Sequence, residues 1–185
     1  MTAALDVFVD RVDRISRCLA YLGGTMLLLI VAVIALEIVL RRVFAVTLGL
    51  GFEMSGYVLA ISSSWAFAYA LFRKAHIRID AAYVRVGQRA RVTLDILALA
   101  AFVAFAVVVC EAAGSVVLES VSRNSLSNTP LQTPLWIPQA LWLAGLAWFA
   151  FATVVLLLRI AVATVSGDFE TVQRLAGSPT LDEKI

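Results

Sequence analysis

Three carboxylates and one histidine are the residues of this chain whose types and surroundings could support chemistry. Glu37, Glu53 and Glu111 lie in or beside long apolar runs, and His76 is the single histidine. A charge at the centre of a bilayer costs about 2.5 to 3.5 kcal/mol, so a carboxylate there marks either an ion pathway or a contact between helices. An ion pathway needs several converging polar groups, whereas these residues belong to different runs. The pattern therefore favours structural or partner contacts over catalysis.

Each carboxylate has its own structural interpretation. Glu37 stands four residues before Arg41, a spacing that predicts an ion pair on one helix face. Glu53 begins an apolar run, where a carboxylate complements the positive end of a helix dipole and is also available to an arginine of a partner. Glu111 lies deepest, close to Gly114, whose missing side chain lets another helix approach. For Glu111 we expect an interhelical contact rather than an ion site.

The remaining reactive residues match no pattern of a catalytic or cofactor site. Cys18 and Cys110 lie in different apolar runs and form no CxxC pair. A single histidine cannot supply the two axial ligands of a bis-histidine haem, and it leaves few ligands for a metal. No nucleophile elbow or phosphate-binding loop occurs. We therefore expect that the chain is not an enzyme and binds no cofactor or metal.

The apolar runs are long enough to cross a membrane. Apolar residues make up 62% of the chain and charged residues 15%, and the mean hydropathy is +0.93. A soluble fold cannot hide that much apolar surface. Backbone groups in lipid need internal hydrogen bonds and the alternation of barrel strands is missing, so the runs are predicted to be helices. We expect an all-α integral membrane protein with four transmembrane helices at about residues 17–40, 51–72, 93–118 and 136–162.

Two flanking segments complete a single membrane domain of residues 1–185. Apolar residues recur at helical spacing within residues 1–16, which predicts an amphipathic interfacial helix or a helix docked on a partner. Three aspartates in this leader and the long apolar core that follows argue against a cleaved signal peptide. Residues 166–185 are predicted to form a loosely held tail.

The distribution of basic residues predicts the orientation. Most lysines and arginines lie in the leader, between the second and third spans, and from Arg159 onward, whereas Arg41, Arg42 and Arg123 lie on the other side. The positive-inside rule then places both termini in the cytoplasm. In a bacterial inner membrane the first and third connections would face the periplasm. Arginines beside the apolar runs are expected to contact lipid phosphates, and nothing indicates a nucleic-acid partner.

The connections carry further polar residues. The third connection, residues 120–138, is rich in Ser, Asn, Thr and Pro. Pro138 is expected to begin the fourth helix, where its missing N–H costs nothing, and Trp136 suits an anchor at the membrane interface. On the cytoplasmic side a solvated turn is expected after the second span, with His76, Arg78 and Asp80.

Four features, in this order along the chain, resemble the small membrane subunit (DctQ type) of tripartite ATP-independent periplasmic (TRAP) transporters. They are Arg41–Phe44 at the end of the first span, Glu53 at the start of the second, the block His76–Asp80 and the segment Ser127–Pro138, whose second half, Thr133–Pro138, includes Pro134 and leads into the fourth span. The resemblance covers nearly the whole chain. It implies a non-catalytic subunit that braces a large multi-helix membrane subunit and helps to dock a periplasmic substrate-binding protein.

The resemblance also implies that the large subunit carries the substrate and ion sites and that the complex takes up an organic acid. The implied periplasmic docking residues are Arg41, Arg42, Glu53 and residues 120–138. The implied cytoplasmic contacts are His76, Arg78 and Asp80.

Two other classes of function stay open. An independent homo-oligomeric small exporter would use Glu111 or Glu37 as its proton carrier and would be active without another subunit. A membrane-bound enzyme or electron carrier would need ligands or nucleophiles that one histidine and two separated cysteines do not supply.

Overall fold

A computed structural model of the chain describes residues 2–45, 49–74 and 87–176. In these ranges the backbone forms the helices α1 (Thr2–Phe44), α2 (Leu50–Phe72), α4 (Gln88–Ser122), α5 (Trp136–Val165) and α6 (Phe169–Ala176). Helices α1, α2, α4 and α5 are long and apolar enough to cross a membrane. The expectation of an all-helical protein with four candidate spans is thereby confirmed.

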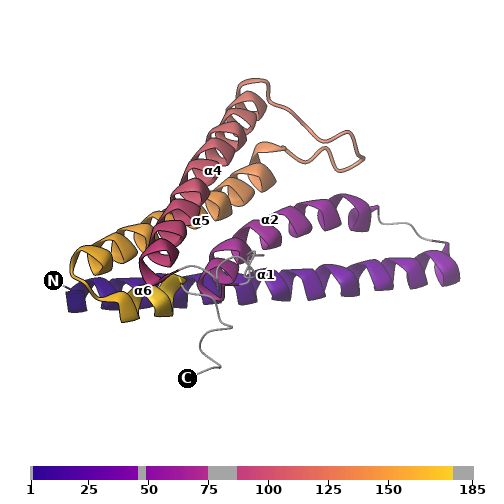
Figure 1. The fold of residues 1–185 in the computed structure, drawn as a ribbon. Helices are drawn as coiled ribbons and strands as arrows, with labels where there is room; N and C mark the ends of the chain where they lie inside the picture. The colour runs from indigo at the N-terminus through magenta and orange to yellow at the C-terminus, as the bar shows by residue number, and fades with distance from the viewer. Residues whose placement is uncertain (1, 46–48, 75–86, 177–185) are drawn as a thin grey trace.

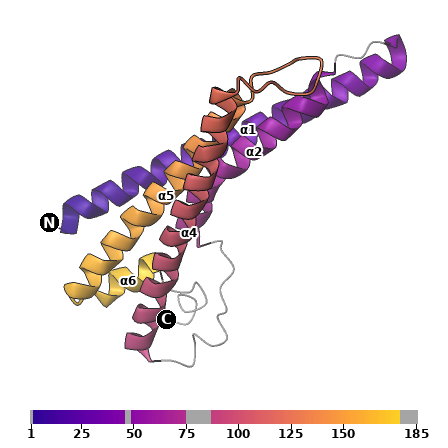
Figure 2. The ribbon, with the colours of Figure 1, turned by 90° about the horizontal axis from the view of Figure 1, so that it is seen from above.

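The helices form two antiparallel pairs joined through their inner members. Helix α1 packs along α2, α4 packs along α5, and the contact between α2 and α5 joins the two pairs. Figure 1 shows the pairs diverging toward the loops at one end, and Figure 2 shows the same array from above. The central helix α5 has 39% of its most apolar window buried and the edge helix α1 only 6%. The two edge helices therefore leave most of their apolar surface to lipid or to a partner.

Helix α1 has no end near residue 16, where the leader was expected to give way to the first span. Val9 and Val12 of the leader are 5% and 2% exposed and belong to the same core cluster as residues of α5. The rings of Phe8 and Phe151 meet edge to face with centroids 6.3 Å apart. Because the apolar stripe of the leader continues into the span and no proline interrupts it, the helix runs on without a break. The leader thus packs on the bundle.

Helix α6 occupies part of the segment that was expected to be a loosely held tail. The chain turns after α5 at Gly167, whose φ of 72° suits a residue without a Cβ. The side chain of Asp168 accepts the N–H of Thr171 at 3.0 Å and so caps the new helix. Val172 is 1% exposed in the core cluster. These eight residues therefore pack against α5.

The crossing of α2 and α5 depends on a glycine. Gly145 of α5 lies against Ser64 and Trp65 of α2, and a Cβ placed on it would stand 2.9 Å from the backbone carbonyl carbon of Ser64. The indole N–H of Trp65 donates to the carbonyl of Leu141 at 3.0 Å across the same crossing. Such close approach of backbones is how small residues stabilise helix pairs in lipid, where dispersion and hydrogen bonds replace the hydrophobic effect.

We expect Gly145→Ala to lower the free energy of unfolding by about 1 to 3 kcal/mol, because the added methyl collides with Ser64 and Trp65. Thermal unfolding in detergent measures the effect. Gly56→Ala and Gly114→Ala are matched controls, since a Cβ at either position meets nothing within 4 Å. Equal stability of all three variants would contradict a tight α2–α5 crossing.

Candidate functional site

Glu53 connects the start of α2 with the connection between α4 and α5. Its side chain is buried, with 7% of the residue exposed. The hydroxyl of Tyr57 donates to Oε1 of Glu53 at 2.8 Å, and the hydroxyl of Thr129 donates to Oε2. Hydrogen bonds to a carboxylate are roughly twice as strong as neutral ones. Glu53 therefore ties α2 to a segment 76 positions further along the chain.

Residues 123–135, here called the outer loop, fold back on themselves. The backbone N–H of Ser127 donates to the carbonyl of Thr133 at 2.9 Å, and the N–H of Thr133 donates to Oγ of Ser127 at 3.1 Å. The hydroxyls of Ser127 and Thr129 lie 2.8 Å apart, which links the loop's own hydrogen bonds to those of Glu53. Asn124 and Gln132 adopt positive φ values of 48° at the two bends. The outer loop is consequently an ordered structure supported by one carboxylate.

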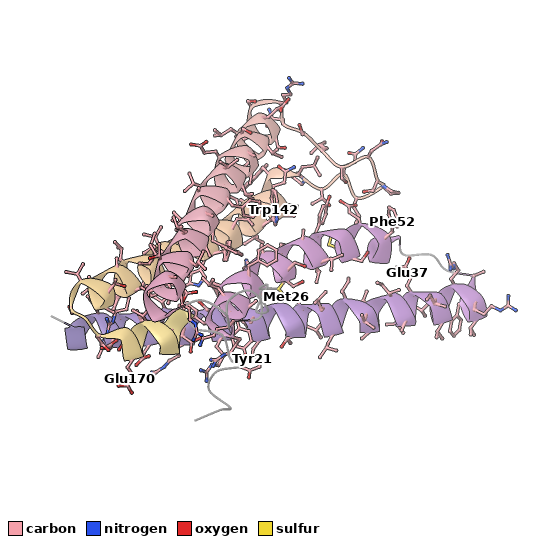
Figure 3. The ribbon with its side chains drawn as sticks, in the orientation of Figure 1. Tyr21, Met26, Glu37, Phe52, Trp142 and Glu170 are labelled. Carbon is pink, nitrogen blue, oxygen red and sulfur yellow. The ribbon has the colours of Figure 1, made fainter. Side chains whose placement is uncertain are left out.

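Glu37 binds the start of α2 and not Arg41. Its Oε1 accepts the N–H of Gly49 at 2.7 Å and its Oε2 accepts the N–H of Gly51 at 2.8 Å. Figure 3 labels Glu37 on α1, on the side toward α2. The first N–H groups of a helix lack partners within it and carry the positive end of its dipole, so they attract a carboxylate. The predicted ion pair is wrong, because Arg41 and Arg42 are exposed beyond this contact and neither binds Glu37.

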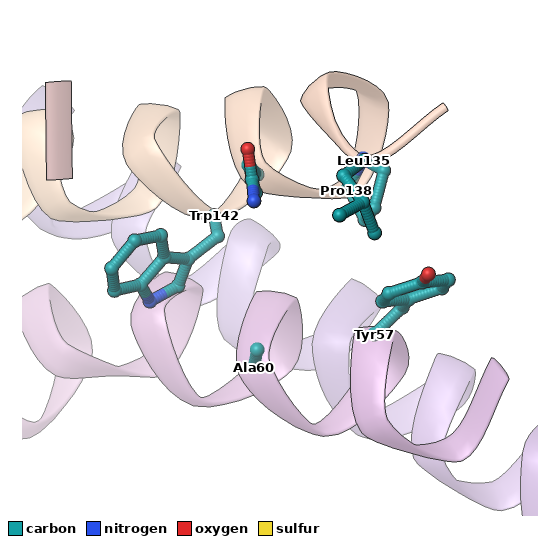
Figure 4. Close-up of a pocket in the computed structure, with 6 residues that line it drawn as sticks. Tyr57, Ala60, Leu135, Pro138 and Trp142 are labelled. Atoms are coloured by element: carbon teal, nitrogen blue, oxygen red, sulfur yellow. The ribbon is translucent and has the colours of Figure 1, made fainter. Parts of the chain in front are cut away.

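A small groove lies below the outer loop, between α2 and α5 (Figure 4). It has a volume of about 100 Å³, and it is lined by Tyr57, Ala60, Leu135, Pro138, Gln139 and Trp142. Small-molecule sites usually have about 300 to 1,000 Å³, so this groove suits a side chain better than a whole organic acid. The buried Oε1 of Gln139 has no hydrogen-bond partner among the residues that the structure describes.

The proline-rich segment before α5 is placed as its sequence suggests. Pro138 is buried in the first turn of α5, where no helical N–H is lost, and Trp136 is 46% exposed at the first position of the helix. Pro134 is half-buried and forms an isolated bridge with Leu126 inside the outer loop. This segment therefore joins the outer loop to α5.

The other end of the bundle holds a partly buried ion pair that sequence reasoning missed. Arg159 of α5 is 1% exposed, and its Nε and Nη2 donate to the two carboxylate oxygens of Asp6 at 2.8 and 3.1 Å. Its Nη1 is buried, and no described residue accepts a hydrogen bond from it. Arg159 had been grouped with the flanking basic residues, but it belongs to the helix core. The one available signal was an arginine followed by a further apolar stretch, Ile160–Val165.

Two more polar contacts hold α1 near the same end. Arg73 at the end of α2 donates to Asp13 at 3.0 Å, and Arg17 donates to the same carboxylate at 3.2 Å. The indole N–H of Trp148 donates to Oγ of Ser16 at 2.9 Å. Together with Asp6 these contacts join the leader to both central helices.

Glu111 stands apart from these contacts. It is exposed on α4, and none of the described residues forms a hydrogen bond or ion pair with it. The structure thus brings Glu37 and Glu53 together at the start of α2 and leaves Glu111 alone. His76, Arg78 and Asp80 lie outside the described residues. Within the described ranges no group of three His, Cys, Asp or Glu side chains is placed to hold a metal ion.

Comparison with known proteins gives one family. The family model described as "Tripartite ATP-independent periplasmic transporters, DctQ component" matches residues 30–163. No curated protein and no solved structure matches the chain. The matched range contains Glu37, Glu53, Glu111 and the whole outer loop.

We expect Asp6→Asn to lower the free energy of unfolding by about 2 kcal/mol, because it leaves the buried Arg159 without a counter-charge. This loss of unfolding free energy is smaller than that expected for a fully buried ion pair, because the side chain of Asp6 is 39% exposed. Chemical unfolding in detergent measures it. Asp10→Asn, on the exposed side of α1, is the matched control and should change stability by less than about 0.5 kcal/mol.

Replacing both Asp6 and Arg159 tests whether the unpaired charge causes the loss of stability. Asp6→Asn combined with Arg159→Met removes the unpaired charge as well, and we expect it to recover most of the lost stability. A double variant that is no more stable than Asp6→Asn alone would contradict the explanation.

Proposed function

Since the chain belongs to the DctQ component family of tripartite ATP-independent periplasmic transporters, we propose that it braces a large membrane subunit and helps to dock a periplasmic binding protein. The chain is a small membrane component of such a transporter. In this proposal it is non-catalytic, and the complex takes up an organic acid with ion coupling. Both termini lie in the cytoplasm of a bacterial cell, and the protein spans the inner membrane.

The observation that carries the docking role is the outer loop held by Glu53. A surface loop binds a partner best when its conformation is set in advance, because less entropy is lost on binding. Thr129, Ser127 and Thr133 are connected to the buried carboxylate through a chain of hydrogen bonds. Arg41 and Arg42 are exposed at the end of α1, at the same end of the array as the loop (Figures 1 and 2). This end supplies both a rigid surface and positive charge.

The bracing role is supported by the shape of the bundle. Four helices in a row, with α2 and α5 central, offer two apolar edge helices to neighbours in the membrane. The groove below the outer loop is too small for a substrate site of ordinary size. On the cytoplasmic side we propose that His76, Arg78 and Asp80 contact the partner.

The rival function, an independent proton-coupled exporter, is less well supported. Glu37, one of its two candidate proton carriers, uses both oxygens to bind the first N–H groups of α2. Protonation there would weaken the start of a helix. Glu111 lies on the outside of α4, and none of the described residues forms a hydrogen bond or ion pair with it that could relay a proton.

Purification of the tagged chain from its native membrane tests the assembly. We expect mass spectrometry to find a large multi-helix membrane protein in roughly stoichiometric amount after gentle solubilisation. Recovery of this chain alone, as a stable oligomer, would contradict the proposal and favour the exporter.

Glu53→Ala tests the outer loop. Losing the hydrogen bond that Thr129 donates to this carboxylate should make opening of the loop easier by about 2 kcal/mol, which corresponds to roughly thirtyfold faster amide exchange at Ser127 and Thr133. Hydrogen exchange of the assembled complex measures the opening, and the affinity of the binding protein for the complex measures docking. We expect faster amide exchange in the loop and weaker affinity of the binding protein for the complex.

Glu170→Ala is the control, because Glu170 is exposed on α6, at the end of the bundle away from the outer loop (Figure 3). Unchanged exchange in Glu53→Ala would refute the support of the loop by Glu53. Faster exchange with full affinity for the binding protein would refute the docking role.

A further inference from the structure

Glu111 interrupts the apolar part of α4 in the outer half of the span. Apolar residues precede it from Ile96 to Cys110, and mostly small or apolar residues follow it to Leu118. At 1.5 Å per residue the carboxylate lies about 10 Å inside the end of this stretch. A glutamate side chain is shorter than the lysine and arginine side chains that reach the interface from such a depth. The carboxylate of Glu111 therefore lies within the hydrocarbon layer of the membrane.

The chain's own helices do not cover Glu111. The buried residues of α4 recur along one stripe toward α5, and Glu111 lies two residues from one of them, about 200° around the helix. This stripe consists of Val92, Asp95, Leu99, Ala106, Ala113 and Ser120. The neighbours of Glu111 on the outward face, Val108 and Leu118, are 63% and 71% exposed. An ionised carboxylate on such a face would cost several kcal/mol in contact with lipid.

The outward face has room for a helix to come close. A Cβ added to Gly114 would meet nothing within 4 Å, and Ala112 and Ser115 beside it are exposed. Small residues at an interface between membrane helices let the backbones approach and strengthen polar contacts between them. Glu111 is thus placed where an approaching helix would exclude lipid from it.

The negative charge of Glu111 indicates the chemistry of the approaching helix. A second copy of the chain that paired through the same face would bring two Glu111 carboxylates together, which is unfavourable. A helix with an arginine or lysine at the same depth would neutralise the carboxylate and satisfy its hydrogen bonds. We propose that the face of α4 around Glu111 packs against a membrane helix of the large subunit, whose Arg or Lys forms an ion pair with Glu111. This inference rests on the proposed function, because it requires that subunit.

The test compares variants of the tagged chain by recovery of the large subunit from native membranes. Glu111→Arg places like charges together, and we expect it to weaken association by about a hundredfold. Glu111→Gln keeps the shape and removes the charge, and we expect a smaller but clear loss of about tenfold. Glu119→Gln, an exposed glutamate near the end of the same helix, is the control and should leave recovery unchanged.

A photo-crosslinking side chain gives a second measurement that does not depend on the charge variants. Placed at Val108, one turn before Glu111, it should crosslink to the large subunit. Placed at Phe105, which is equally exposed at 62% but lies about 120° around the helix from Glu111, against about 60° for Val108, it should crosslink less. Both probes leave Glu111 in place.

The outcomes separate the two proposals. If the wild-type chain recovers no large subunit, the proposed function fails and the inference fails with it. If the wild type recovers it and Glu111→Gln recovers it equally well, the ion pair is refuted while the proposed function stands. Crosslinks from position 105 but none from position 108 would likewise refute the choice of face.

Discussion

In an apolar bundle each charge needs a partner, because neither lipid nor packed side chains can replace water around it. Three charged residues of this chain meet that requirement within the fold, each in a different way. Glu37 binds backbone N–H groups, Glu53 binds the hydroxyl of Thr129 in the outer loop, and Arg159 binds a carboxylate. These contacts help to fix the arrangement of the helices, since each joins two different elements: α1 and α2, α2 and the outer loop, and α1 and α5.

Helix α2 depends most on such contacts. Glu37 of α1 binds its first turn, and Glu53 in the same turn binds the outer loop. Gly145 of α5 packs against its middle. Its last turn is joined to the leader through Arg73 and Asp13. The helix thus connects both ends of the bundle, which explains how a row of helices with two exposed edges keeps a defined shape. Internal rigidity of this kind is what the proposed bracing role requires.

Sequence patterns predicted spans well and contacts poorly, for physical reasons. Glu37 was assigned to Arg41 because i, i+4 spacing is visible in the sequence, yet the unpaired N–H groups of another helix bind its carboxylate. The leader was expected to end near residue 16, but Val9 and Val12 find a core on α5 that no local pattern reveals. Arg159 counted as a flanking basic residue because its partner, Asp6, stands 153 positions away.

The sequence by itself determined that this is an all-helical membrane protein with four candidate spans, and it indicated the family. Hydrophobic length is a local property, and the motifs around Glu53 and Pro138 are short enough to read along the chain. Only the tertiary structure decided which charges are satisfied within the chain and which, like Glu111, are left outside. That choice depends on which helix faces meet, and helix faces separated by long stretches of chain meet only when the whole bundle is packed.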